Sequence, residues 1–75
     1  MELTCVFEEA AEGGYIAYVE EIPGANSQGE TLEEARDNLR DAIRELMAAN
    51  REIAEASLRQ RQTPAIREAW NISRG

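Results

Sequence analysis

Apolar and polar residues alternate along the first third of the chain, as they do in half-buried β-strands. Leu3, Cys5 and Phe7 share one side of a first predicted strand at residues 2–8. A polar turn ending in two glycines leads to a second predicted strand at residues 15–22, which is rich in β-forming residues. Its two sides carry Tyr15, Ala17 and Val19, and Ile16, Tyr18, Glu20 and Ile22. Because both sides are largely apolar, we expect both to be covered.

A turn and a helix start follow the second strand. The Pro-Gly pair at 23–24 turns the chain, and residues 25–28 fit a short third strand before Gly29. Thr31 and Glu34 then have the spacing of a capping box. In this motif the Thr31 hydroxyl accepts a hydrogen bond from the third residue after it, and the Glu34 carboxylate reaches back to the Thr31 N–H. The sequence therefore predicts a helix that begins directly after Thr31.

The predicted helix is amphipathic. Its apolar residues recur at spacings of three and four: Leu32, Ala35, Leu39, Ala42, Ile43, Leu46, Ala49 and Ile53. No glycine or proline interrupts residues 30–63, so we expect the helix to run to about Leu58.

The last stretch, residues 65–73, fits two structures. As a helix it would be capped by Thr63 and would have Pro64 in its first position. As a strand, its apolar side would carry Ile66, Trp70 and Ile72, with Glu68 between them. The β-branched and aromatic residues favour the strand. The predicted order is β-β-β-α-β, an α+β domain in which one helix crosses one sheet and leaves the other face for a second copy of the chain.

Length and composition narrow what can stabilise this fold. The chain has 75 residues, which allows a single domain at residues 1–75 with a small core. It has one cysteine and no histidine, which excludes an internal disulfide and the usual structural zinc sites. A partner subunit remains, so we expect a homodimer or a higher homo-oligomer. The residues expected in the core or at the dimer interface are Tyr15, Ile16, Tyr18, Val19, Leu39, Ile43, Leu46 and Trp70.

The charge is divided unevenly along the chain. Fifteen acidic and eight basic residues give a net charge of −7. Residues 1–34 contain nine glutamates and no basic residue, whereas residues 35–75 contain six acidic residues and eight arginines. This division predicts a basic protein partner and argues against nucleic-acid binding by this chain alone, since phosphate attraction dominates such binding. The glutamates predicted to bind the partner are Glu8, Glu9, Glu20 and Glu21.

The sequence contains no pattern of a catalytic, cofactor-binding or metal site. The lack of histidine excludes histidine-dependent catalysis, and Cys5 is expected to be a buried, inert thiol. Neighbouring glutamates on a strand point to opposite faces and do not converge. No apolar run reaches the length of a membrane span. We therefore predict a non-enzymatic, cytoplasmic interaction domain.

Two segments resemble a known family. Residues 13–17 (GGYIA) and 22–35 (IPGANSQGETLEEA) are similar to the pattern of HicB-type antitoxins. The motif positions are Gly14, Tyr15, Pro23, Gly24, Gly29, Thr31 and Glu34.

The resemblance implies a partial ribonuclease-H-like fold, an antiparallel sheet of three to four strands packed by one helix, with the last stretch beside the first strand. It also implies an antitoxin that neutralises a small basic mRNA-cleaving toxin of the HicA type. Longer members append a DNA-binding module, which is not expected here because only two residues follow Ser73. Two alternatives stay open. One is a binding module of the same fold without a toxin, and the other is a nucleic-acid binder or vestigial nuclease.

Overall fold

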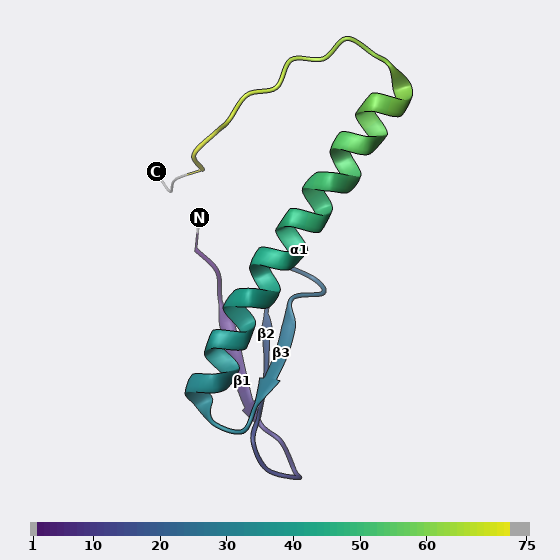
Figure 1. Cartoon of the computed structure of the whole chain (residues 1–75). Coiled ribbons are helices and arrows are strands. Elements are labelled where there is room, and N and C mark those ends of the chain that lie inside the picture. Colours follow the sequence, from purple (N-terminus) through teal and green to yellow (C-terminus); the bar gives the residue numbers. More distant parts are fainter. Residues whose placement is uncertain (1, 73–75) are drawn as a thin grey trace.

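A computed structural model describes residues 2–72, which contain three strands and one helix (Figure 1). The strands are β1 (Cys5–Glu9), β2 (Tyr15–Val19) and β3 (Asn26–Gly29), and the helix is α1 (Leu32–Arg61). This architecture confirms the predicted α+β fold and the order of its first four elements.

The strands form one antiparallel sheet in the order β1-β2-β3. Phe7 lies opposite Ala17, and Ala17 lies opposite Ser27, so these three side chains share one face of the sheet. The turn between β1 and β2 is closed by the N–H of Ala10, which donates to the carbonyl of Gly14 at 3.0 Å.

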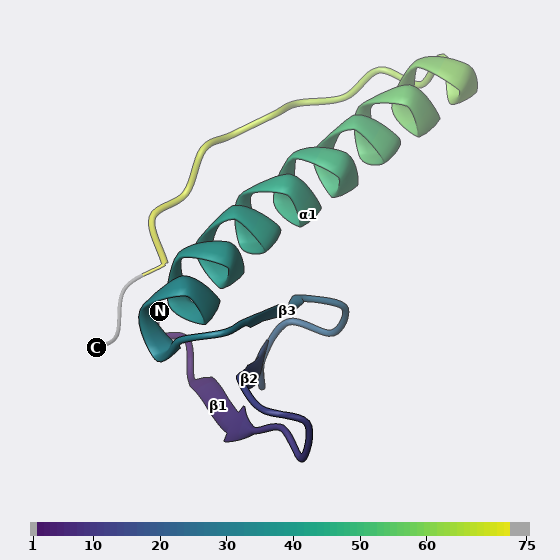
Figure 2. The same cartoon turned by 60° about the horizontal axis from the view of Figure 1, so that its bottom comes forward.

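Helix α1 covers one face of the sheet, mainly over β2 and β3 (Figure 2). The buried core between the two layers consists of Ala17, Val19, Ala25, Ala35 and Leu39. Tyr15, Ile43 and Leu46 are partly buried and pack against this core. β3 begins and ends one residue later than predicted. Ala25 is instead part of the turn before it, where its carbonyl accepts from the N–H of Val19 at 3.1 Å.

The helix is longer than predicted, and its second half extends beyond the sheet (Figure 1). It ends at Arg61 rather than near Leu58, and Gln62 adopts a left-handed conformation with φ of 53°. Pro64 determines this end, because the residue before a proline avoids the helical region. At 1.5 Å per residue, α1 is about 45 Å long. In the described part of the chain, no helix is both long enough and apolar enough to cross a membrane.

The predicted fourth strand is not found in the described part of the chain. Residues 63–72, here called the tail, form neither helix nor strand, and Ser73 lies outside the described residues. The tail turns back along α1 toward the start of β1 (Figure 1). Ile66 and Trp70 are 90% and 76% exposed, so Trp70 is not part of the core of a single chain. The tail follows α1 instead of the edge of β1 (Figure 1), and an ion pair between Arg67 and Glu55 at 2.8 Å joins it to the helix.

Candidate functional site

The face of the sheet opposite α1 has an apolar centre that no described element covers. Val6 lies opposite Tyr18, and both half-buried side chains share this face with Ile16, which is 45% exposed. Glu8 and Gln28 lie on either side of Ile16, on β1 and β3. We call this surface, made of these five residues, the open face. An apolar centre with a polar rim is the layout of a protein–protein interface.

The four glutamates predicted to bind a partner do not form one site. All four are exposed, but only Glu8 belongs to the open face, and Glu9 points to the other side of β1. Glu20 and Glu21 follow β2 at the opposite end of the sheet. Glu20 continues the open side of β2, since its N–H still donates to the carbonyl of Thr4 at 3.0 Å. Glu8 and Glu20 therefore flank the apolar centre from its two ends.

Glu21 is held by a contact within the chain. Its carboxylate accepts from the backbone N–H of Thr4 at 2.6 Å and from the Thr4 hydroxyl at 2.7 Å. The backbone hydrogen bond from Thr4 is the main cause that lowers the pKa of Glu21, and the hydroxyl acts in the same direction. The contact ties the residue before β1 to the loop after β2. Sequence patterns could not reveal it, because the two residues are 17 positions apart.

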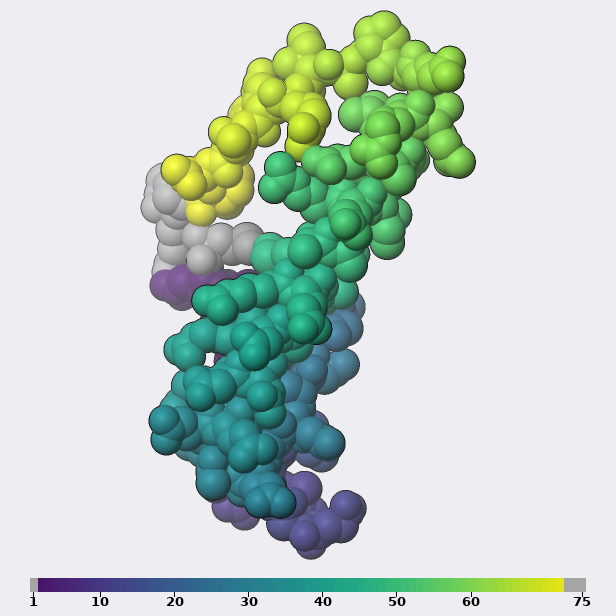
Figure 3. Space-filling view, viewed as in Figure 1, coloured from purple at the N-terminus to yellow at the C-terminus, as the bar shows by residue number. Residues whose placement is uncertain are grey.

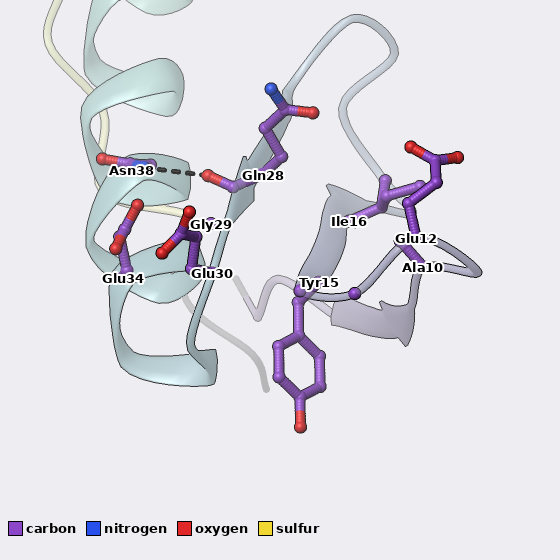
Figure 4. A pocket seen from close by; sticks show the side chains of 11 residues that line it. Ala10, Glu12, Tyr15, Ile16, Gln28, Gly29, Glu30, Glu34 and Asn38 are labelled. Carbon is purple, nitrogen blue, oxygen red and sulfur yellow. Dashed lines mark hydrogen bonds between the residues drawn. The ribbon is translucent and has the colours of Figure 1, made fainter.

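A second feature is an acidic hollow of about 450 Å³ where the β1–β2 turn meets the start of α1 (Figure 4). Glu12 lines it from the turn, and Glu30 and Glu34 line it from the segment that begins the helix. The side-chain amide of Asn38 donates to the backbone carbonyl of Gln28 at 2.8 Å and joins α1 to β3 beside the hollow. No sequence pattern points to Glu12 or Glu30, because periodicity does not place residues that lie in turns.

These carboxylates do not gather into a metal site. Among residues 2–72, no group of three Asp, Glu or Cys side chains lies close enough to hold a metal ion. Cys5 is exposed, whereas it was expected to be buried. The reason is that β1 is an edge strand and α1 packs over β2 and β3 instead.

Several motif positions have structural roles at the junction of the sheet and helix. Gly14 has φ of +78°, and a Cβ there would lie 2.7 Å from the carbonyl oxygen of Gly29. A Cβ on Gly29 would lie 2.5 Å from the backbone nitrogen of Ala35. The Thr31 hydroxyl accepts from the N–H of Glu34 at 3.1 Å, which caps the helix. These positions therefore bring β2, β3 and α1 together.

Two proteins of Synechocystis sp. are similar to part of this chain. The UPF0150 protein ssl0738 is 55% identical over 42 residues, which cover 56% of this chain and 58% of that protein. The UPF0150 protein ssr1765 is 42% identical over 40 residues, which cover 53% of this chain and 51% of that protein. The chain thus matches little more than half the length of these relatives, whose names give a family and no activity. No protein-family model and no solved structure matches the chain.

Proposed function

We propose that this chain is a HicB-like antitoxin that binds and neutralises a small basic toxin of the HicA type. The observation that carries the proposal is the open face, with Ile16 and Tyr18 at its centre, Glu8 at one end and Glu20 just beyond the other end. The similarity of the segments around the first two turns to HicB-type antitoxins supports the nature of the partner.

The division of charge between the two layers supports the same partner. All nine glutamates of residues 1–34 lie in the sheet layer, its turns and the first turn of α1, and all eight arginines lie in α1 or after it. A cationic toxin is therefore attracted toward the sheet, which speeds encounter. Burial of the apolar centre then supplies affinity. Capture of this kind is binding without catalysis, and it takes place in the cytoplasm, where the toxin meets messenger RNA.

Charge reversal on the open face tests the proposal. The probe is the product of the neighbouring gene, which the proposal requires to be a small basic protein. We expect the double variant Glu8→Arg/Glu20→Arg to capture this protein at least tenfold more slowly at low salt. The difference should shrink at high salt, because ions screen exposed charges. Glu45→Arg/Glu52→Arg makes the same charge change on exposed positions of α1 and should capture at the wild-type rate.

Growth provides the second measurement. The wild-type chain should restore growth to cells that express the neighbouring basic protein, and the Glu8/Glu20 variant should not. If that variant folds, captures and rescues like the wild type, the open face is not the toxin site. If the neighbouring gene encodes no basic protein, a binding module without a toxin becomes the favoured function.

A further inference from the structure

A small apolar hollow lies between β1 and α1, on the side of the sheet that the helix leaves partly open. It measures about 200 Å³ and is lined by Cys5, Phe7, Arg36, Leu39, Arg40 and Ile43. We call it the β1 groove. The guanidinium of Arg36 lies 5.8 Å from the centre of the Phe7 ring, and Arg40 adds a second positive charge. The groove therefore suits one large apolar side chain that is accompanied by a carboxylate.

The tail matches this description, and it is poorly packed on its own helix. A hollow of about 420 Å³, lined by residues of both, separates the tail from α1, and the gap is visible in Figure 3. One ion pair joins the two, between Arg67 and Glu55 at 2.8 Å. Ion pairs this exposed contribute little to stability. The large side chain of Trp70 thus remains in solvent, and the exposure of its apolar surface to water is unfavourable.

In its own chain, Trp70 reaches only the near end of the β1 groove, at Ile43, which lies about 27 Å along α1 from Arg61. From Leu39, which lines the groove, to Arg61 at its end, α1 rises about 33 Å. The nine residues from Gln62 to Trp70 span at most about 32 Å when fully extended, and the chain must also reverse direction. A second copy of the chain has no such restriction.

We propose that two copies of this chain exchange tails. The tail of each copy lies along β1 of the other and places Trp70 in the β1 groove. Because side chains alternate along an extended segment, Glu68 lies on the same side as Trp70. There it faces the guanidinium groups of Arg36 and Arg40, which explains a carboxylate on the apolar side of the tail. β1 is an edge strand and can pair with an incoming chain, so the predicted fourth strand forms only between copies.

The large solvent-exposed area of the whole chain supports a second copy of the chain as the occupant of the β1 groove. The chain exposes 6449 Å², whereas a compact monomer of 8.4 kDa exposes about 4,600 Å². The excess of about 1,800 Å² exceeds the roughly 800 Å² that each partner contributes to a standard interface. Met47 and Ile53 on α1, which are 53% and 68% exposed, contribute to this excess.

The tryptophan itself reports on the proposal, because Trp70 is the only one in the chain. With rising concentration, we expect the sedimentation mass to double and the emission maximum to move to shorter wavelength with the same midpoint. Glu68→Arg should weaken the dimer at least tenfold, and Glu68→Arg/Arg40→Glu should recover most of that loss. Glu12→Arg makes the same charge change in the acidic hollow and should dimerise like the wild type.

Disulfide trapping tests the exchange directly. Cys5 lines the groove and is the only native cysteine, so a disulfide between Cys5 and Trp70→Cys shows whether the tail occupies the groove of its own chain or of the other copy. After oxidation of mixed light and heavy isotope-labelled chains, we expect disulfides between Cys5 of one chain and position 70 of the other. A chain that stays monomeric, a dimer without an emission shift, or a disulfide within one chain would overturn the proposal. These measurements need no toxin, so they succeed or fail separately from the proposed function.

Discussion

At the scale of single residues, the contact between Thr4 and Glu21 couples stability to pH. The folded-state pKa of Glu21 is lowered, first by the backbone N–H of Thr4 and then by its hydroxyl. A carboxyl group with a lowered folded-state pKa contributes stability above its unfolded-state pKa, and this contribution is lost as the pH falls through the folded-state pKa. The contact therefore stabilises the fold at neutral pH and fails in acid.

We expect Thr4→Val to raise the titration midpoint of the Glu21 carboxyl group, measured by NMR. The rise should be partial, because the backbone N–H of Thr4 remains and is the larger cause. Below about pH 5 the wild type loses the stability that the ionised Glu21 contributes. Glu21→Gln has no carboxyl group to protonate at this position, so its stability should fall less in this range. An unchanged midpoint in Thr4→Val would show that the hydroxyl does not act on the carboxylate in solution.

The N-cap of α1 allows a second prediction at this scale. The Thr31 hydroxyl accepts from the N–H of Glu34, so Thr31→Val leaves that N–H without its partner in the chain. We expect this variant to lower the free energy of unfolding by about 1 kcal/mol, measured by urea denaturation. Thr31→Ser keeps the oxygen and should stay within a few tenths of a kcal/mol of the wild type. Equal losses in both variants would contradict the capping role.

At the scale of elements, the meeting of the sheet with the start of α1 depends on Gly29. A Cβ at this position would press on the backbone of Ala35, which cannot move aside as a flexible side chain could. We expect Gly29→Ala to destabilise the fold by roughly 1–3 kcal/mol and to shift the amide NMR signals of the first turn of α1. Gly13→Ala is the control for the clash, since nothing lies within 4 Å of a Cβ there, although Gly13, unlike Gly29, has a positive φ that strains an alanine. It should leave the signals of α1 in place.

Helices and strands that are determined by residues close together in the sequence could be predicted. Alternation predicted β1 and β2, although β1 begins three residues later than predicted, at Cys5, and β2 ends three residues earlier, at Val19. The capping box placed the start of α1 at Leu32. The apolar centre of the open face was also predictable, because both sides of β2 are apolar. Helix α1 ends at Arg61, three residues later than predicted. The reason is that Pro64 prevents helix only at the residues just before it.

Features that depend on tertiary geometry could not be predicted. The tail has the pattern of a strand, but whether a strand edge lies within its reach depends on the length of α1. The hydrogen bonds between Thr4 and Glu21 join loops that only the folded hairpin brings together. Glu12 and Glu30 share the acidic hollow for the same reason. Local patterns thus define elements, and the site arises from how those elements meet.

At the scale of the whole molecule, the chain is elongated. Its radius of gyration over Cα atoms is 16.3 Å, whereas a compact domain of 75 residues has about 11 Å. The cause is the mismatch between a helix of 30 residues and strands of four or five residues. Only the first half of α1 rests on the sheet, so a single chain has one firmly packed region and one region without a core.

Hydrogen exchange should reveal these two regions. In dilute solution we expect the amides of residues 35–46 and of β2 to exchange most slowly, because they enclose the core. Amides of residues 48–61 should exchange faster, since opening that part of α1 exposes little further apolar surface. Uniform protection along α1 in the dilute chain would contradict this division. Protection of residues 48–61 that rises with concentration, together with protection of β1, would show that a second copy supplies the packing that one chain lacks.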